Sequence, residues 1–450
     1  MNTEKLSLPE IYPVACHTDH VGQGSTFVAI RGMKDDGIQF VPRAIERGAQ
    51  RIVVADGVPV PSELVDTMNA QGLELIRVPE PRRALAELAA QAHDFPAQSL
   101  KIVATTGTKG KSTTTFLIEH LLRSAGKRTA LLSTVKNTIL GQPFPTKLTT
   151  QQPDYLQTFF ALCRDAGVEW VAMEVAAQAF SLYRVHGLVF EAGVFTNFSR
   201  EHGEFYPDQE DYFAAKCCLL RQLKPGAPLL LNADDVRVAA LAAQYGGAEL
   251  FSRAHPYSCP QLVGSFNAYN IAAAAGVVRA LGLRDEEIGA GLATFAGVPG
   301  RLDRYALKNG AVAFIDYAHN QASMEAVLSQ LRGMTDDLTV VFGAGGDRDP
   351  VKRPEMGRVA AQIGDAVFVT ADNPRSEDPA AIAQQIVAGI PDQTRGKVVV
   401  ELDRERAIVA ACQRSRRGSI IALLGKGPDE YQIVKGVTIP FSERAILQRF

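Results

Sequence analysis

The segment V-A-T-T-G-T-K-G-K-S-T at residues 103–113 decides the fold of this chain. A run of small and β-branched residues leads into a turn that contains Gly107 and Gly110, and Lys111 and Ser112 open an amphipathic stretch. A strand, a glycine-containing turn and a helix in this order bind phosphate. Backbone N–H groups and the helix N-terminus face the anion, the lysine adds positive charge, and the serine ligates Mg²⁺. The segment predicts a nucleoside triphosphate site; the alternative is a glycine-rich turn that binds no ligand.

Short β-branched runs alternate with amphipathic segments over most of the chain. The runs that predict strands lie at 101–106, 129–134, 170–175, 192–196, 228–232, 311–317, 338–343, 366–370, 397–402 and 419–424. This alternation predicts parallel sheets covered by helices on both faces. Ten strands usually divide between two sheets, so we expect two sheets here. We expect an α/β protein of three domains: a small N-terminal α/β domain (1–98), a central P-loop ATPase-like parallel sheet (99–299) and a C-terminal Rossmann-like sheet (300–450).

The composition excludes several classes of function. Lysine and arginine number 47 against 49 aspartates and glutamates, and a net charge of −2 gives no support to binding of nucleic acid or of a membrane surface. The sequence has no apolar run long enough to cross a membrane and no secretory signal pattern. Its six cysteines are scattered without a C-x-x-C pair, so neither a disulfide framework nor a thiolate zinc site is predicted. We expect a cytoplasmic monomer that acts on small molecules.

A resemblance to a known family begins at the phosphate loop. Thr105 stands where the eight-residue loop pattern has its first glycine, and the shortened loop T-G-T-K-G-K-S-T at 106–113 resembles the ATP loop of the Mur ligase family, written TGTNGK(T/S). Further matches follow in the family's order: M-E-V at 173–175, T-N at 196–197, Y-F-A-A-K at 212–216, F-N-A-Y-N at 266–270, D-Y-A-H at 316–319, G-G-D-R-D at 345–349, D-N-P-R at 372–375 and G-K-G at 425–427. The last three resemble the MurE branch, and the resemblance covers nearly the whole chain.

The resemblance implies an ATP-dependent ligase. Such an enzyme activates a carboxylate as an acyl-phosphate and couples it to an amine. In the MurE branch the acid is UDP-MurNAc-L-Ala-D-Glu and the amine is that of meso-diaminopimelate. The alternatives are a MurE-like paralogue that acts on a different carboxylate in a specialised biosynthetic pathway, and a non-catalytic module that binds nucleotide with the same fold.

The resemblance also implies the residues that bind ATP and metal. Those that contact ATP are Gly107, Thr108, Lys109, Gly110, Lys111, Ser112, Thr113, Asn270, Arg301 and Asp316. The catalytic residues are Lys111, Glu174, His202 and Lys216, and two Mg²⁺ ions are held by Ser112, Glu174, His202 and a CO2-derived carbamate on Lys216. Taken alone, Glu174 could also be a solvent-facing carboxylate, Lys216 a solvated helix lysine and Asn270 a helix N-cap.

Two further groups of residues match the substrate contacts of the family. On the acid side these are Thr149, Thr150 and Arg184; on the amino-acid side they are Arg348, Asp372, Asn373, Arg375, Gly425 and Asp429. In the MurE branch the arginine of D-N-P-R pairs with the far carboxylate of diaminopimelate, and bidentate pairing of this kind is specific. The tetrapeptide alone is also an ordinary turn. The family's G-K-G-H-E is G-K-G-P-D-E here, which leaves Asp429 and Glu430 as alternatives.

The sequence departs from the family mainly on the side of the sugar-nucleotide substrate. The family's E-V-S-S-H is E-V-A-A-Q at 174–178, so two hydroxyls are missing. The uridine-site D-S-R is H-T-D at 17–19, so Asp19 replaces a cation. The chain is also shorter than MurE relatives between 251 and 264. Because a polar site loses discrimination when its hydrogen-bonding groups are removed, these departures favour the paralogue as the second interpretation.

Overall fold

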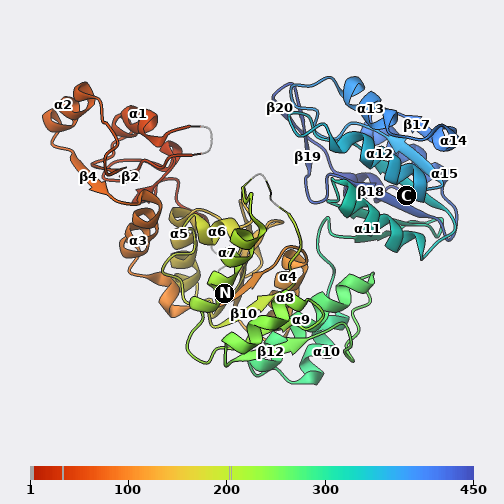
Figure 1. Cartoon of the computed structure of the whole chain (residues 1–450), viewed down its shortest axis with the longest axis horizontal. Coiled ribbons are helices and arrows are strands. Elements are labelled where there is room, and N and C mark those ends of the chain that lie inside the picture. Colours follow the sequence, from red (N-terminus) through yellow and green to blue (C-terminus); the bar gives the residue numbers. More distant parts are fainter. Residues whose placement is uncertain (1–4, 33–34, 202, 204) are drawn as a thin grey trace. The chain divides into compact units, whose positions relative to one another are not determined.

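The computed structural model describes residues 5–32, 35–201, 203 and 205–450 (Figure 1). The chain divides into two compact units. The first comprises Met1–Cys259 and Phe266–Phe295, and the second comprises Pro260–Ser265 and Ala296–Phe450. Each unit is built from parallel-rich sheets and helices, which confirms the predicted α/β class.

A four-stranded parallel sheet opens the first unit. Its strands, in spatial order, are β1 (Val14–Ala15), β2 (Thr26–Val28), β3 (Arg51–Ala55) and β4 (Glu74–Val78). The α-helices of this region are α1 (Val41–Glu46), α2 (Ser62–Ala70) and α3 (Pro81–Ala92). Apolar side chains form one cluster on each face of the sheet, and α3 contributes Leu85 and Ala89 to the smaller of the two.

An eight-stranded sheet forms the centre of the first unit. Its spatial order is β12 (Ala248–Phe251), β11 (Leu229–Asn232), β10 (Ala192–Phe195), β5 (Lys101–Thr106), β9 (Trp170–Glu174), β6 (Thr129–Leu132), β7 (Asn137–Ile139) and β8 (Gln142–Phe144). The strands from β12 to β6 are parallel, whereas β7 and β8 add an antiparallel edge. Strand β5 is buried from its second residue onward, as expected for a parallel strand covered on both faces.

Helices cover both faces of this central sheet. They are α4 (Lys111–Ser124), α5 (Pro153–Asp165), α6 (Ala177–Ser181), α7 (Gln209–Arg221), α8 (Val236–Ala239), α9 (Ser265–Ala280) and α10 (Asp285–Ala293). Because the strands on either side of β5 run parallel to it, their carboxyl ends lie at the same edge as the phosphate loop. That edge is where ligands bind in open α/β sheets.

The second unit holds a six-stranded sheet. Its spatial order is β13 (Asp303–Ala306), β14 (Val312–Asp316), β18 (Ile420–Leu424), β15 (Leu338–Phe342), β16 (Ala366–Val369) and β17 (Val398–Val400). All pairs are parallel except β13 with β14, and a separate hairpin is formed by β19 (Tyr431–Val434) and β20 (Val437–Pro440). The helices are α11 (Gln321–Arg332), α12 (Lys352–Ile363), α13 (Pro379–Ala388), α14 (Asp392–Arg395), α15 (Arg404–Arg414) and α16 (Glu443–Leu447).

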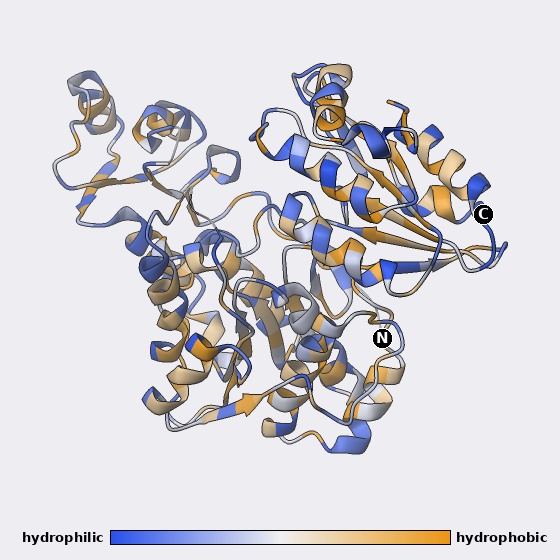
Figure 2. Ribbon diagram, turned by 45° about the vertical axis from the view of Figure 1, so that its right-hand side comes forward, coloured by the Kyte–Doolittle hydropathy of each residue, from blue (hydrophilic) through white to orange (hydrophobic). Residues whose placement is uncertain are grey.

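Hydropathy follows this layering. In the second unit the inner strands are mostly orange in Figure 2, and the covering helices carry blue residues on part of their surface. Strands β15 and β18 are buried at every position, so both faces of the sheet are core. Within the part of the chain that the structure describes, no helix is both long and apolar enough to cross a membrane.

Candidate active site

The phosphate loop runs from the end of β5 to the start of α4, and its two glycines are required by the backbone conformation and by close neighbours. Gly107 has a φ of 139°, and a Cβ there would lie 2.0 Å from Thr196 Oγ1. Gly110 has a φ of 83°, and a Cβ there would lie 2.4 Å from Asn270 Oδ1. Residues other than glycine rarely adopt such φ values, and both distances are too short for a contact with a Cβ atom. The backbone of the loop therefore requires glycine at both positions.

Hydrogen bonds from two sides fix the loop. Lys111 Nζ donates to the carbonyl oxygens of Gly107 and Thr108, each at 2.9 Å. From the end of β10, Asn197 Nδ2 donates to the Lys109 carbonyl at 2.9 Å, and Asn197 Oδ1 accepts from the Lys109 N–H at 2.9 Å. Asn197 was not predicted as a site residue, although it belongs to the T-N match at 196–197 and follows the predicted strand 192–196.

The first two turns of α4 carry the remaining loop residues. Ser112 is half-buried and Thr113 is buried at the start of the helix. Asn270 lies close by, inside α9 rather than at its N-cap, so the interpretation as a cap is wrong. Its Nδ2 donates to Asn267 Oδ1 at 2.8 Å, and its Oδ1 accepts from Thr114 Oγ1 at 3.3 Å. The structure therefore brings Asn270 to the phosphate loop.

Glu174 ends β9, the strand next to β5, and is 1% exposed. Its Oε1 accepts from the Thr134 N–H and its Oε2 from Thr134 Oγ1, each at 3.0 Å. A solvent-facing carboxylate is therefore excluded. Thr134 was not predicted as a site residue, and only its position at the end of the predicted strand 129–134 pointed to it.

Lys216 in α7 is also 1% exposed, so the interpretation as a solvated helix lysine is wrong. Its Nζ donates to the Gly107 carbonyl at 2.8 Å and lies 4.5 Å from the centre of the Tyr212 ring. Burial, together with the positive charge of Lys111, lowers the pKa of Lys216 to about 6. The amine is therefore mostly neutral at pH 7. His202 lies outside the described residues.

The predicted acid-substrate residues gather beside Glu174. Thr149 Oγ1 lies 3.0 Å from Thr134 Oγ1, and Thr150 Oγ1 donates to the Glu174 carbonyl at 3.0 Å. Arg184 Nη1 donates to the Thr150 carbonyl at 3.0 Å, and burial lowers the pKa of this arginine. These three side chains therefore line the same edge of the central sheet as the phosphate loop.

Arg301 and Asp316 belong to the second unit. Asp316 ends β14, where its Oδ2 accepts from the Leu302 N–H and its Oδ1 from the Ala318 N–H, each at 2.8 Å. Burial raises the pKa of Asp316, although the charge of Arg301 opposes this shift. The Arg301 guanidinium lies 5.0 Å from the centre of the Tyr317 ring. The structure places the two predicted ATP contacts close together.

The D-N-P-R and G-K-G motifs meet at the carboxyl edge of the second sheet, after β16 and β18. Asp372 and Asn373 are buried, and a Cβ on Gly425 would lie 2.7 Å from Asp372 Oδ2. Asn373 Oδ1 accepts from the Ile433 N–H at 3.0 Å. Among the described residues, Asp372 Oδ2 is buried without a hydrogen-bond partner. A buried carboxylate oxygen of this kind calls for a donor from a ligand or a solvent molecule.

Arg375 is held in a left-handed backbone conformation, with a φ of 53°. Its N–H donates to the Ile433 carbonyl at 2.9 Å, and its Nη1 donates to the Gly346 carbonyl at 2.7 Å. Arg375 therefore lies against the G-G-D-R-D loop, whose Arg348 is exposed.

Of the two alternative carboxylates, Asp429 is half-buried and Glu430 is exposed. Burial raises the pKa of Asp429, while Lys426 opposes this. Lys426 itself was not predicted, yet it is fully buried, and its Nζ donates to the Tyr431 carbonyl and, at 3.4 Å, to Asn373 Oδ1. Its place in the G-K-G match at 425–427 was the sequence signal. Asp429 is the carboxylate that faces the motif cluster.

Known proteins resemble this chain along nearly its whole length. Residues 10–93 match the Mur ligase family catalytic domain, 105–259 the Mur ligase middle domain and 300–427 the Mur ligase glutamate ligase domain. The UDP-N-acetylmuramoyl-L-alanyl-D-glutamate–2,6-diaminopimelate ligase of Gloeobacter violaceus is 37% identical over 472 aligned positions, which cover 97% of this chain and 94% of that protein. The enzyme of the same name from Geobacillus kaustophilus is 35% identical with the same coverage.

Solved structures agree with these matches. A UDP-N-acetylmuramoyl-L-alanyl-D-glutamate–2,6-diaminopimelate ligase superposes with a TM-score of 0.64 at 26% identity, covering 98% of this chain and 94% of that one. The MurF ligase of Thermotoga maritima in complex with ADP superposes with a TM-score of 0.61 at 19% identity, covering 91% and 93%, which shows the fold alone. With three matching domains and relatives above 30% identity, the chain belongs to the Mur ligase family.

Proposed function

We propose that this chain is an ATP-dependent ligase that joins meso-diaminopimelate to UDP-MurNAc-L-Ala-D-Glu. The observation that carries the proposal is the cluster at the carboxyl edge of the second sheet, where Arg375 lies beside the buried Asp372 and Asn373. The relatives from Gloeobacter violaceus and Geobacillus kaustophilus, which carry that activity in their names, support it. We propose further that the enzyme acts as a cytoplasmic monomer on small-molecule substrates.

The reaction takes place in two steps. An oxygen of the substrate carboxylate attacks the γ-phosphorus of ATP, the bond to the β,γ-bridging oxygen breaks, and ADP leaves. The amine of the amino acid then attacks the acyl-phosphate carbon, the C–O bond to phosphate breaks, an amide forms, and the amine loses a proton. Lys111 and the N–H groups of the phosphate loop stabilise the transferring phosphoryl group by positive charge and oriented dipoles.

The residues around the loop fit a magnesium site. Ser112, Glu174 and a carbamate on Lys216 would supply hard oxygen ligands. Within the described part of the chain, which does not include His202, no three His, Cys, Asp or Glu side chains gather as a metal site. A carbamate on Lys216 would add an anionic oxygen ligand to Ser112 and Glu174. Mg²⁺, when bound, supplies charge that neutralises the phosphate oxygens. Thr134, which donates to both Glu174 oxygens, orients the carboxylate.

The environment of Lys216 suits the formation of a carbamate. CO2 reacts only with a neutral amine: the Nζ–C bond forms and one proton is released. Burial and the neighbouring Lys111 lower the pKa of Lys216 to about 6, so most of the amine is neutral at pH 7. The carbamate carries a negative charge next to Lys111, which stabilises it after it has formed.

The second unit would bind the amino acid. The buried Asp372 Oδ2 lacks a donor, and an ammonium group of diaminopimelate would supply one. Arg375 presents a guanidinium that pairs with a carboxylate through two parallel hydrogen bonds. A monocarboxylate amine such as lysine offers no second carboxylate, so the site would discriminate against it.

A specific observation favours a second candidate, a MurE-like ligase acting on a different carboxylate. Asp19, which stands where the family has a cation, is exposed and accepts from Arg43 Nη2 at 2.9 Å. Asp19 therefore places a negative charge, paired with Arg43, where the family has a cation that could bind an anionic substrate.

Release of phosphate from ATP tests the two candidates together. We expect release with UDP-MurNAc-L-Ala-D-Glu plus meso-diaminopimelate, and much slower release when L-lysine replaces diaminopimelate. Release with another carboxylate but not with the UDP-sugar would favour the second candidate. Binding of ATP without release on any acid would refute both and identify a nucleotide-binding module.

A further inference from the structure

A fully buried ion pair lies beneath the amino-acid motifs of the second unit. Arg404 is the first residue of α15 and Glu443 the first of α16, and they are 1% and 4% exposed. Arg404 Nε donates to Glu443 Oε1 at 2.9 Å, and Nη2 lies 2.8 Å from the same oxygen. Desolvation makes a buried pair a poor source of stability in comparison with apolar residues of the same size. A role beyond stability therefore has to be considered.

The other contacts of Arg404 point to that role. Its Nη2 donates to the Leu424 carbonyl at 2.9 Å, and its Nη1 makes a longer contact of 3.4 Å to the Ala371 carbonyl. Leu424 directly precedes the G-K-G motif, and Ala371 directly precedes D-N-P-R. Strands β18 and β16 do not pair with each other, because β15 lies between them. The guanidinium thus connects the ends of two strands that do not pair with each other, in addition to the backbone bridge that Arg375 and Val434 form farther along the two loops.

The two motifs depend on a close fit with each other. Gly425 approaches Asp372 so closely that a Cβ would lie 2.7 Å from Asp372 Oδ2, and Lys426 contacts Asn373. We propose that Arg404, held by Glu443, is a positioning residue that fixes the D-N-P-R loop relative to the G-K-G loop. Arg404 does not itself contact the amino acid. It fixes the position of the Asp372 carboxylate, which would bind the amino acid. This inference rests on the proposed function only in naming the amino acid.

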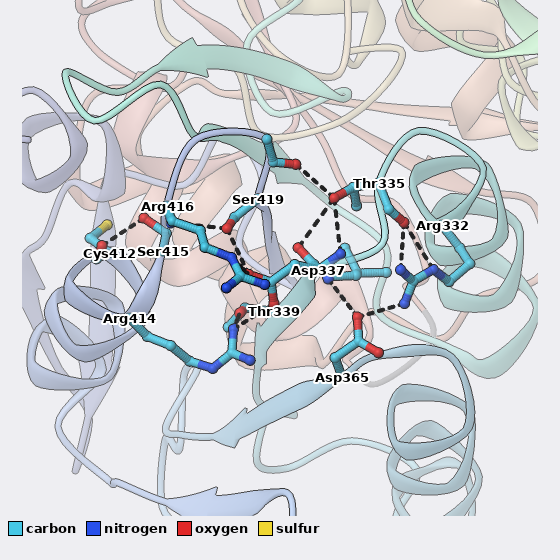
Figure 3. Close-up of polar contacts among 12 residues, drawn as sticks. Arg332, Thr335, Asp337, Thr339, Asp365, Cys412, Arg414, Ser415, Arg416 and Ser419 are labelled. Atoms are coloured by element: carbon cyan, nitrogen blue, oxygen red, sulfur yellow. Dashed lines mark hydrogen bonds and ion pairs between the residues drawn. The ribbon is translucent and has the colours of Figure 1, made fainter.

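The opposite end of α15 provides a matched control. Arg414, the last residue of the helix, donates to Asp337 Oδ1 at 2.9 Å and to Thr339 Oγ1 at 2.8 Å (Figure 3). Asp337 also accepts from Ser419 Oγ at 2.7 Å. These contacts lie at the amino ends of β15 and β18, away from the motifs. Helix α15 therefore contacts the strands at both their amino and their carboxyl ends. Only Arg404 lies at the carboxyl ends, where the amino-acid motifs are.

The first test compares Arg404→Lys with Arg414→Lys. Lysine keeps the positive charge, but its single nitrogen cannot replace three guanidinium nitrogens that reach separate acceptors. We expect Arg404→Lys to raise the KM for meso-diaminopimelate about tenfold or more, and to leave the KM for ATP within about twofold. Arg414→Lys should leave both values near those of the parent. Equal changes in the two KM values of Arg404→Lys would overturn the proposal.

A double variant separates positioning from stability. Arg404→Met with Glu443→Leu replaces the pair by apolar side chains, which commonly preserves stability. We expect a melting temperature near that of the parent but the same rise in the KM for diaminopimelate. An unchanged KM in this folded variant would show that the pair is merely structural. If the double variant does not fold, Arg404→Lys decides.

Hydrogen–deuterium exchange tests the clamp without any substrate. In Arg404→Lys, peptides covering 371–377 and 425–434 should both exchange faster than in the parent, and in Arg414→Lys neither should. Unchanged exchange in either segment would overturn the proposal. Absence of phosphate release by the parent enzyme would instead refute the proposed function and leave the exchange result valid, so the two failures are distinguishable.

Discussion

The environment of Lys216 predicts that this lysine destabilises the folded chain at neutral pH. Replacing it by methionine keeps the length of the side chain and removes the charge. In the folded chain burial and Lys111 lower the pKa of Lys216 to about 6, whereas an ordinary lysine has 10.5. Between these two values the unfolded chain binds one more proton than the folded chain, so stability rises with pH throughout that interval.

The size of the effect follows from the two pKa values. Each pH unit inside the interval corresponds to about 1.4 kcal/mol. The energetic cost of holding Lys216 neutral is therefore about 5 kcal/mol at pH 7 and about 2 kcal/mol at pH 9. Lys216→Met avoids this cost, so it should be more stable than the parent at pH 7, and the difference should shrink by about 3 kcal/mol at pH 9.

Fluorescence of the single tryptophan offers a local assay. Trp170 lies in β9, in the same sheet as the phosphate loop, so its emission reports unfolding of the region that contains Lys216. Urea unfolding of parent and variant is followed at pH 7 and pH 9 in buffer freed of CO2. Added bicarbonate should then stabilise the parent but not the variant, because only the folded amine forms a carbamate.

The control for this experiment is the exposed Lys127, which lies in the same unit. Lys127→Met should not reproduce the decrease of about 3 kcal/mol between pH 7 and pH 9 that is expected for Lys216→Met. The reasoning about Lys216 is refuted if the difference between Lys216→Met and the parent stays constant from pH 7 to pH 9, or if it grows.

Three other substitutions probe the remaining parts of the site. Gly107→Ala should weaken binding of ADP by roughly tenfold or more, since its Cβ would lie 2.0 Å from Thr196 Oγ1; calorimetry that shows parent-like affinity would contradict this. Arg375→Ala should raise the KM for meso-diaminopimelate on the order of a hundredfold without changing that for ATP, and equal changes would rule out carboxylate pairing. Glu174→Gln should raise the Mg²⁺ concentration for half-maximal phosphate release by about tenfold or more; an unchanged Mg²⁺ titration would exclude a metal role.

The ten predicted runs correspond to nine inner strands of the two large sheets and to one edge strand, β17, whereas the other edge strands of these sheets were missed. Each of the ten predicted runs contains an observed strand, because continuous apolar stretches such as β15 and β18 are buried on both faces. The strands that were missed, including β7, β8, β12 and β13, lie at or near sheet edges. There one side of the strand lacks a neighbour, and the sequence need not be uniformly apolar.

The residues of the candidate site could be predicted wherever they belong to a short sequence motif. Gly107 and Gly110 have positive φ values that favour glycine, and Asp372 belongs to the D-N-P-R motif, so a short pattern finds all three. Thr134 and Arg404 act through contacts with residues distant in sequence, Thr134 with the Glu174 carboxylate and Arg404 with the Leu424 carbonyl. Because every residue has a main-chain carbonyl, the sequence does not show which residue accepts the hydrogen bond from Arg404.

The position of β18 has a consequence for the making of this protein. The strand is the last of its sheet along the chain, yet it lies in the middle, pairing Ile420 with both Val312 and Leu338. Until residues 420–424 leave the ribosome, β14 and β15 each present an apolar edge with unpaired backbone groups, which favours association with other chains. Nascent chains that stop before this strand should depend on chaperones or be degraded. The amino-acid motifs can therefore come together only after nearly the whole polypeptide has been made.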